Sequence, residues 1–109
     1  PVNAILCSNQ PHEPFTRAVI PAESLLGGEP LFVGHAPPGQ PLGRGVRQGL
    51  QDYIAQHGQP PRVLLMQNHG LVVLGQTPEE VLTGTAIVVK SARILTATQA
   101  WGGPHYVDQ

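Results

Sequence analysis

Two short apolar runs, separated by a brief polar stretch, are the feature that most constrains how this chain folds. The runs cover residues 63–66 (Val-Leu-Leu-Met) and 71–74 (Leu-Val-Val-Leu), and Asn68-His69-Gly70 lies between them. Each run is too short for a helix but long enough for a buried strand. So brief an interruption, with a glycine that permits a tight turn, predicts a hairpin or a sharply bent strand.

A capped helix is predicted directly after this hairpin. Thr77 occupies the N-cap position, Pro78 the first helical position, and Glu80 completes a capping box. We expect the helix to run to about Trp101, where Gly102-Gly103-Pro104 ends it. Its apolar residues cover more than one face, which is typical of a helix buried on two sides.

The preceding part of the chain predicts further strands and helices. Residues Val2 to Ser8 have the composition of a short buried strand, and Leu31 to Val33 of another. The segment from Gln10 to Ile20 is ambiguous, but Pro11 and Pro14 would suit the first turn of a helix that continues through Phe15, Ala18 and Val19. An amphipathic helix is expected from Leu42 to His57, closed by Gly58. This order of elements predicts a mixed sheet with helices on its faces.

Composition restricts the class of protein. The 109 residues predict a single domain. Charged residues make up only 12% of the chain, about half the usual share, which suggests surface hidden against another subunit of a homo-oligomer or against a missing partner segment. The net charge of -1 without basic clusters argues against nucleic-acid partners, and no unbroken apolar run approaches the ~20 residues of a membrane span. The single cysteine, Cys7, fits a reducing compartment and hence the cytoplasm.

His69 is the most informative candidate for chemistry. It is expected at the end of a buried strand and beside a glycine, so the backbone would hold its imidazole in a fixed orientation. A pre-oriented imidazole suits a metal ligand or a general base. The alternative, and the commoner situation for a single histidine, is a structural residue in a hairpin turn.

The segment Asn68-His69-Gly70-Leu71-Val72-Val73-Leu74-Gly75, with the capped helix after it, resembles the class II aldolase/adducin family. That family includes fuculose-, rhamnulose- and ribulose-phosphate aldolases and epimerases. The resemblance continues upstream in Leu26-Gly27-Gly28-Glu29-Pro30 and Ala36-Pro37-Pro38-Gly39. It spans nearly the whole chain but only the second half of a typical family domain.

The resemblance implies that residues 1–109 form one domain, the C-terminal portion of the family's domain, truncated at its N-terminus. The implied fold is α/β, with three α/β/α layers around a mixed, largely antiparallel central sheet.

Members of this family hold a divalent metal, usually zinc, with three histidines. The resemblance implies that His69 is the third ligand, and that a His-x-His pair at the end of a strand falls on Cys7 and Asn9. Zinc accepts a thiolate readily, but an asparagine side chain is a poor zinc ligand. His12 and His35 are the candidate substitutes, although nothing in their spacing marks them as ligands. A buried, inert thiol at a strand end is the alternative for Cys7.

The family's acid/base glutamate and phosphate-binding segments precede the His-x-His strand, so no catalytic residue is assigned here and enzymatic activity stays open. Three hypotheses follow. The first is a class II aldolase/adducin-like domain with a degraded metal site and a non-catalytic binding or scaffolding role, as adducin-type members imply. The second is a metal-dependent sugar-phosphate aldolase with an altered Cys/His site, completed by a missing N-terminal half. The third is an oligomeric interaction module.

The resemblance also implies a homotetramer. In the family, C-terminal segments pack near a neighbouring subunit's site, which makes Tyr106 a candidate substrate or subunit contact. Packing is the more common role of such an aromatic residue.

Overall fold

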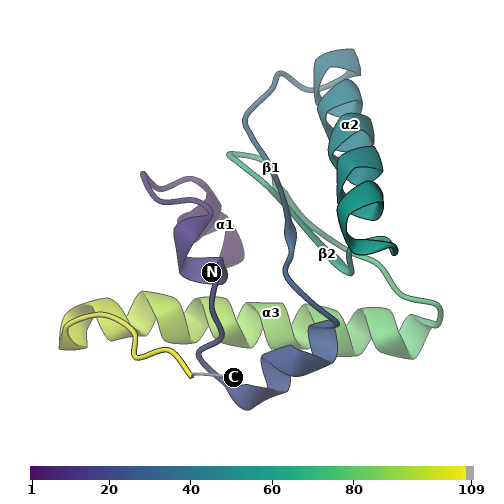
Figure 1. The fold of residues 1–109 in the computed structure, drawn as a ribbon. Helices are drawn as coiled ribbons and strands as arrows, with labels where there is room; N and C mark the ends of the chain where they lie inside the picture. The colour runs from purple at the N-terminus through teal and green to yellow at the C-terminus, as the bar shows by residue number, and fades with distance from the viewer. Residues whose placement is uncertain (108–109) are drawn as a thin grey trace.

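The computed structural model describes residues 1–107, in which short helices and a small sheet pack beside the long helix near the C-terminal end (Figure 1). The chain therefore combines helices with a small sheet in an α/β arrangement. In chain order the elements are α1 (Val2–Leu6), the 3-10 helices η1 (Glu13–Phe15) and η2 (Pro21–Leu26), β1 (Leu31–Val33), α2 (Gln40–His57), β2 (Val63–Met66), β3 (Gly70–Val73), α3 (Pro78–Thr98) and the 3-10 helix η3 (Gln99–Trp101).

The sheet is mixed, as expected, with β2 between β1 and β3. β1 runs parallel to β2, with Leu31 opposite Leu64, and α2 forms the crossover between them. β3 runs antiparallel to β2, with Met66 opposite Gly70. The two apolar runs of the sequence therefore form the predicted hairpin, and one of the two pairings of the sheet is parallel.

α2 packs against one face of β1 through its glycines. A Cβ atom on Gly49 would lie 3.4 Å from both δ carbons of Leu31, and one on Gly45 would lie 3.6 Å from Cγ1 of Val33. These glycines cost helix stability, but they permit a close approach of helix and strand. α2 ends at Gly58, which adopts the left-handed conformation and donates its N–H to the Ile54 carbonyl.

α3 begins with the predicted cap. The Glu80 N–H donates to Thr77 Oγ1 at 3.1 Å, and Glu80 Oε2 accepts the Gln76 N–H at 2.6 Å. The helix buries a single stripe with three- and four-residue spacing, so the expectation of burial on two sides is wrong for the described chain. Leu82, for example, is 71% exposed. The buried stripe consists of Gly84, Ile87, Val88, Ser91, Ala92 and Leu95.

The strand expected at Val2 to Ser8 is wrong, because α1 occupies this segment. The chain forms a short helix there, with Val2, Ile5 and Leu6 buried and Ala4 exposed. This i, i+3, i+4 pattern is helical, whereas a strand would alternate buried and exposed residues. Because α1 contacts both α3 and β3, tertiary packing decides its conformation. The helix expected to continue through Ala18 and Val19 does not form, and between Gln10 and Ile20 only the 3-10 turn η1 is helical.

The hydrophobic core lies between α1, α3 and the face of β2 that carries Val63 and Leu65. Figure 1 shows α3 running past α1 and the sheet along the length of the molecule. By length and composition alone, the helical segment Pro78–Trp101 could also cross a membrane. In the fold, 33% of its most apolar 18-residue stretch is buried. A core helix of a globular domain has the same properties, and Val88, Ala92 and Leu95 of α3 belong to the core.

Candidate functional site

The turn between β2 and β3 presents His69. Asn68 adopts a left-handed conformation with φ of 57°, the one described residue other than glycine that has a positive φ. Asparagine tolerates this conformation better than most residues. The His69 N–H donates to the Met66 carbonyl at 3.1 Å and closes the turn. The His69 side chain is exposed, so the turn holds its backbone firmly while the imidazole faces solvent.

A backbone hydrogen bond joins this turn to the end of α1. The Asn68 N–H donates to the Leu6 carbonyl at 3.1 Å. Asn3 lies near the same turn, since a Cβ on Gly70 would be 3.9 Å from its Oδ1. The residue before His69 therefore contacts the residue before Cys7. The structure thus brings together two segments that are about sixty positions apart in the chain.

A second set of hydrogen bonds joins the turn to the end of β1. The Gln67 N–H donates to the Val33 carbonyl at 2.9 Å, and the His35 N–H donates to Gln67 Oε1 at 3.1 Å. Gln67 therefore positions the loop that carries His35. The imidazole of His35 is exposed.

His12 approaches the same region from the loop before η1. Its ring stacks on Phe32 of β1, with 4.7 Å between the ring centres and 19° between the planes. Phe32 directly precedes Val33, whose carbonyl accepts the hydrogen bond from the Gln67 N–H. Stacking on an aromatic ring accounts for the position of His12 without any metal.

Cys7 and Asn9 lie in the turn that follows α1. Cys7 is the C-cap of that helix, and its N–H donates to the Asn3 carbonyl at 2.9 Å. Its thiol is free and exposed, so the expectation of a buried thiol at a strand end is wrong. The reason is that the apolar stripe of α1 ends at Leu6. Asn9 is also exposed.

Among the residues that the structure describes, the donor set does not fit a zinc centre. Within residues 1–107, no three side chains from histidine, cysteine, aspartate or glutamate come together in a group that could hold a metal ion. Zinc in proteins takes three or four such ligands. Cys7 and His69 are brought close by their backbones, but Asn9 adds only a weak donor.

Tyr106 packs against the core cluster within its own chain. Its hydroxyl donates to the Pro14 carbonyl at 3.4 Å, and the Arg17 guanidinium lies 5.0 Å from the centre of its ring. These contacts fasten the C-terminal segment to the loop near η1. A role in substrate or subunit contact stays a prediction.

Sequence reasoning missed Gln67, which links the hairpin turn to the end of β1. No signal pointed to it, because a glutamine at the end of an apolar run is indistinguishable from an ordinary exposed turn residue. Its role depends on the parallel pairing of β1 with β2, which the hydrophobic pattern alone did not reveal.

Comparison with known proteins adds an independent result. The family model described as class II aldolase and adducin N-terminal domain matches residues 1–96. A search among curated proteins gave no match. The matched range includes the α1 turn with Cys7, the sheet, the His69 turn and almost all of α3. The chain belongs to the family of class II aldolase and adducin N-terminal domains.

Proposed function

We propose that this chain is a class II aldolase/adducin-like domain with a degraded metal site, which binds or scaffolds without catalysing aldol cleavage. The donor set carries the proposal. By the resemblance described above, Cys7 and Asn9 occupy the positions of two metal-binding histidines, and both are exposed in the turn after α1. His69 alone supplies an imidazole, and one thiolate with one imidazole rarely fixes zinc without a further good ligand.

A second candidate is a metal-dependent sugar-phosphate aldolase with an altered Cys/His site. One observation favours it: the 3.1 Å hydrogen bond from Asn68 to Leu6 brings the neighbours of His69 and Cys7 together. In this candidate another segment would supply the remaining ligand, the acid/base group and the phosphate contacts.

Metal content separates the two candidates. We would measure zinc by elemental mass spectrometry on protein purified without chelator or a metal-affinity tag, for the unaltered chain and for His69→Ala and Cys7→Ser. His105→Ala is the matched control, because His105 is exposed on the C-terminal segment. The proposal predicts no zinc above background in any sample. About one zinc per chain, lost in both variants and kept in the control, would refute it and justify aldol-cleavage assays.

We also propose that the domain is cytoplasmic and assembles as a homo-oligomer, with a tetramer as the form the family suggests. The low charge of the chain and several exposed apolar side chains support assembly. Leu25, Leu82 and Trp101 are 62%, 71% and 88% exposed. Light scattering during size-exclusion chromatography tests this, and a monomer at all accessible concentrations would contradict it.

The arrangement of helices supports a three-layer interpretation of the fold. α2 contacts β1 through Val33 and Leu31, whereas Val63 and Leu65, on alternate positions of β2, belong to the core with α1 and α3. We propose that these are the layers of an α/β/α domain of the fuculose-, rhamnulose- or ribulose-phosphate aldolase type.

A further inference from the structure

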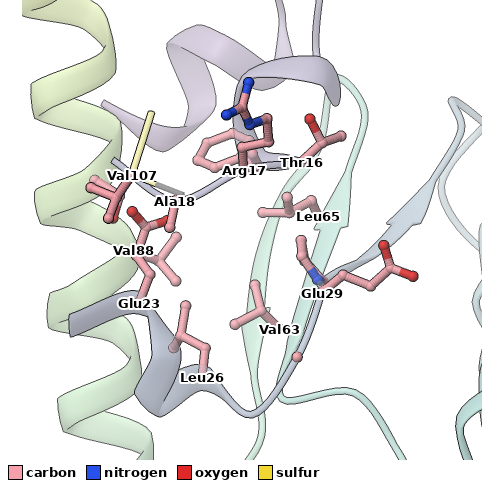
Figure 2. Close-up of a pocket in the computed structure, with 14 residues that line it drawn as sticks. Thr16, Arg17, Ala18, Glu23, Leu26, Glu29, Val63, Leu65, Val88 and Val107 are labelled. Atoms are coloured by element: carbon pink, nitrogen blue, oxygen red, sulfur yellow. The ribbon is translucent and has the colours of Figure 1, made fainter. Parts of the chain in front are cut away.

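A cavity of about 430 Å³ lies between β2, α3 and the segment that contains η1 and η2 (Figure 2). This volume is in the range of small-molecule sites in proteins. The cavity is separate from the His69 turn, because none of the candidate metal ligands lines it. Its apolar lining consists mainly of Phe15, Leu26, Val63, Leu65 and Val88.

Ser91 of α3 lines the same cavity and carries an unusual hydroxyl. The residue is 1% exposed, and among the described residues its Oγ has no hydrogen-bond partner. Two threonines of the same helix show the ordinary alternative. Thr85 Oγ1 donates to the Val81 carbonyl at 2.7 Å, and Thr98 Oγ1 donates to the Leu95 carbonyl at 2.8 Å. A buried hydroxyl without a partner costs folding free energy, and a ligand that pairs with it would recover that cost.

The charges around the cavity restrict what it can bind. Glu23 belongs to the wall, and its Oε2 accepts the backbone N–H groups of Val19 at 2.7 Å and Ile20 at 3.1 Å. This fixed carboxylate disfavours an anionic ligand such as a sugar phosphate.

The two other charged residues of the lining are directed elsewhere. In Figure 2 the Glu29 carboxylate points away from Val63 and Leu65, and its Oε1 lies 3.2 Å from His57 Nε2. The guanidinium of Arg17 lies over the ring of Tyr106. Figure 2 shows Leu26, Val63, Leu65 and Val88 directed toward one common space, which an apolar group would fill.

We propose that this cavity binds a compact, uncharged and largely apolar molecule with one hydroxyl group, which forms a hydrogen bond with Ser91. The apolar lining would contact the body of the ligand. The Ser91 hydroxyl can donate or accept, so it pairs with an alcohol or a phenol in either direction.

Benzyl alcohol is a suitable probe, with toluene and benzoate as comparisons. Titrations of the ¹⁵N-labelled chain would be followed by amide chemical shifts. We expect benzyl alcohol to shift the amides of the lining residues saturably and to bind about three- to ten-fold more tightly than toluene, the effect of one neutral hydrogen bond. Benzoate should bind more weakly than benzyl alcohol because of Glu23.

Two variants test the assignment to this cavity. Ser91→Ala should reduce the affinity for benzyl alcohol to that for toluene, and it removes an unpaired buried hydroxyl, so the fold should persist. Ala18→Leu should fill the cavity and abolish binding, whereas the matched control Ala86→Leu, on an exposed position of α3, should not.

The absence of saturable shifts in the lining residues would overturn the proposal. Equal affinities for benzyl alcohol and toluene, or an unchanged affinity in Ser91→Ala, would overturn it too. None of these outcomes depends on metal content, so the cavity and the proposed function of the His69 region are tested separately.

Discussion

Replacing Gly84 by alanine sets two effects of known size against each other. Gly84 is buried in α3, and a Cβ atom there would lie 2.9 Å from Cγ1 of Val73 on β3. Alanine stabilises a helix interior by about 1 kcal/mol relative to glycine. Forcing an additional methyl group into a packed core costs about 1–3 kcal/mol. Because the short, branched side chain of Val73 has little freedom to move, we expect the steric cost to prevail.

Gly84→Ala should therefore lower the free energy of unfolding by about 1 kcal/mol, or Tm by about 4 °C for a chain of this length. In a Val73→Ala background the clashing γ carbons are gone, so the same substitution should stabilise by about 1 kcal/mol. The sign of the effect should thus reverse between the two backgrounds, which corresponds to a coupling of about 2 kcal/mol.

Urea unfolding, monitored by far-UV circular dichroism, measures all four proteins of this double-mutant cycle. Gly43→Ala is the control, because nothing lies within 4 Å of its added Cβ and it should simply stabilise α2. If Gly84→Ala stabilised the chain equally in both backgrounds, the close approach of α3 to β3 would be refuted.

Three further predictions concern single features. Thr77→Ala should lower the free energy of unfolding by about 1 kcal/mol in chemical denaturation, whereas Thr77→Ser should change it little, because either hydroxyl accepts the Glu80 N–H. Asn68→Val should lower the free energy of unfolding by about 1–2 kcal/mol, because residue 68 has a positive φ, whereas Asn68→Gly should change it little. Equal losses in the two variants would contradict the left-handed turn. Burial, with a smaller effect of Glu29, raises the pKa of Tyr53 above 10.0. The unfolded chain therefore releases this proton first, and stability should fall as pH rises above about 10, less steeply in Tyr53→Phe, which pH-dependent denaturation would reveal.

Local signals predicted the second half of the chain well. The hairpin follows from two apolar runs around Asn68-His69-Gly70, and the start of α3 from Thr77 and Glu80, whose hydrogen bonds form between near neighbours. Turn and cap preferences act within a few residues, so they are readable without knowledge of the tertiary structure.

The N-terminal segment was not predictable in the same way. Val2, Ile5 and Leu6 are equally compatible with a short buried strand and with one helical stripe, and the contacts of α1 with α3 and β3 select the helix. For the same reason, only part of the candidate site could be predicted from the sequence. The turn of His69 is local, whereas its connections to Leu6 and Val33 depend on how distant segments pack.

The hydrogen bond between Leu6 and Asn68 has a consequence for the order of folding. A helix of five residues is too short to be stable alone, and α1 packs against elements that follow it by more than sixty positions. The hairpin and α3 involve contacts between near neighbours and can form early. We therefore expect the α1 helix to form only once β3 and α3, which it contacts, are in place, so the position of Cys7 beside the His69 turn depends on that packing.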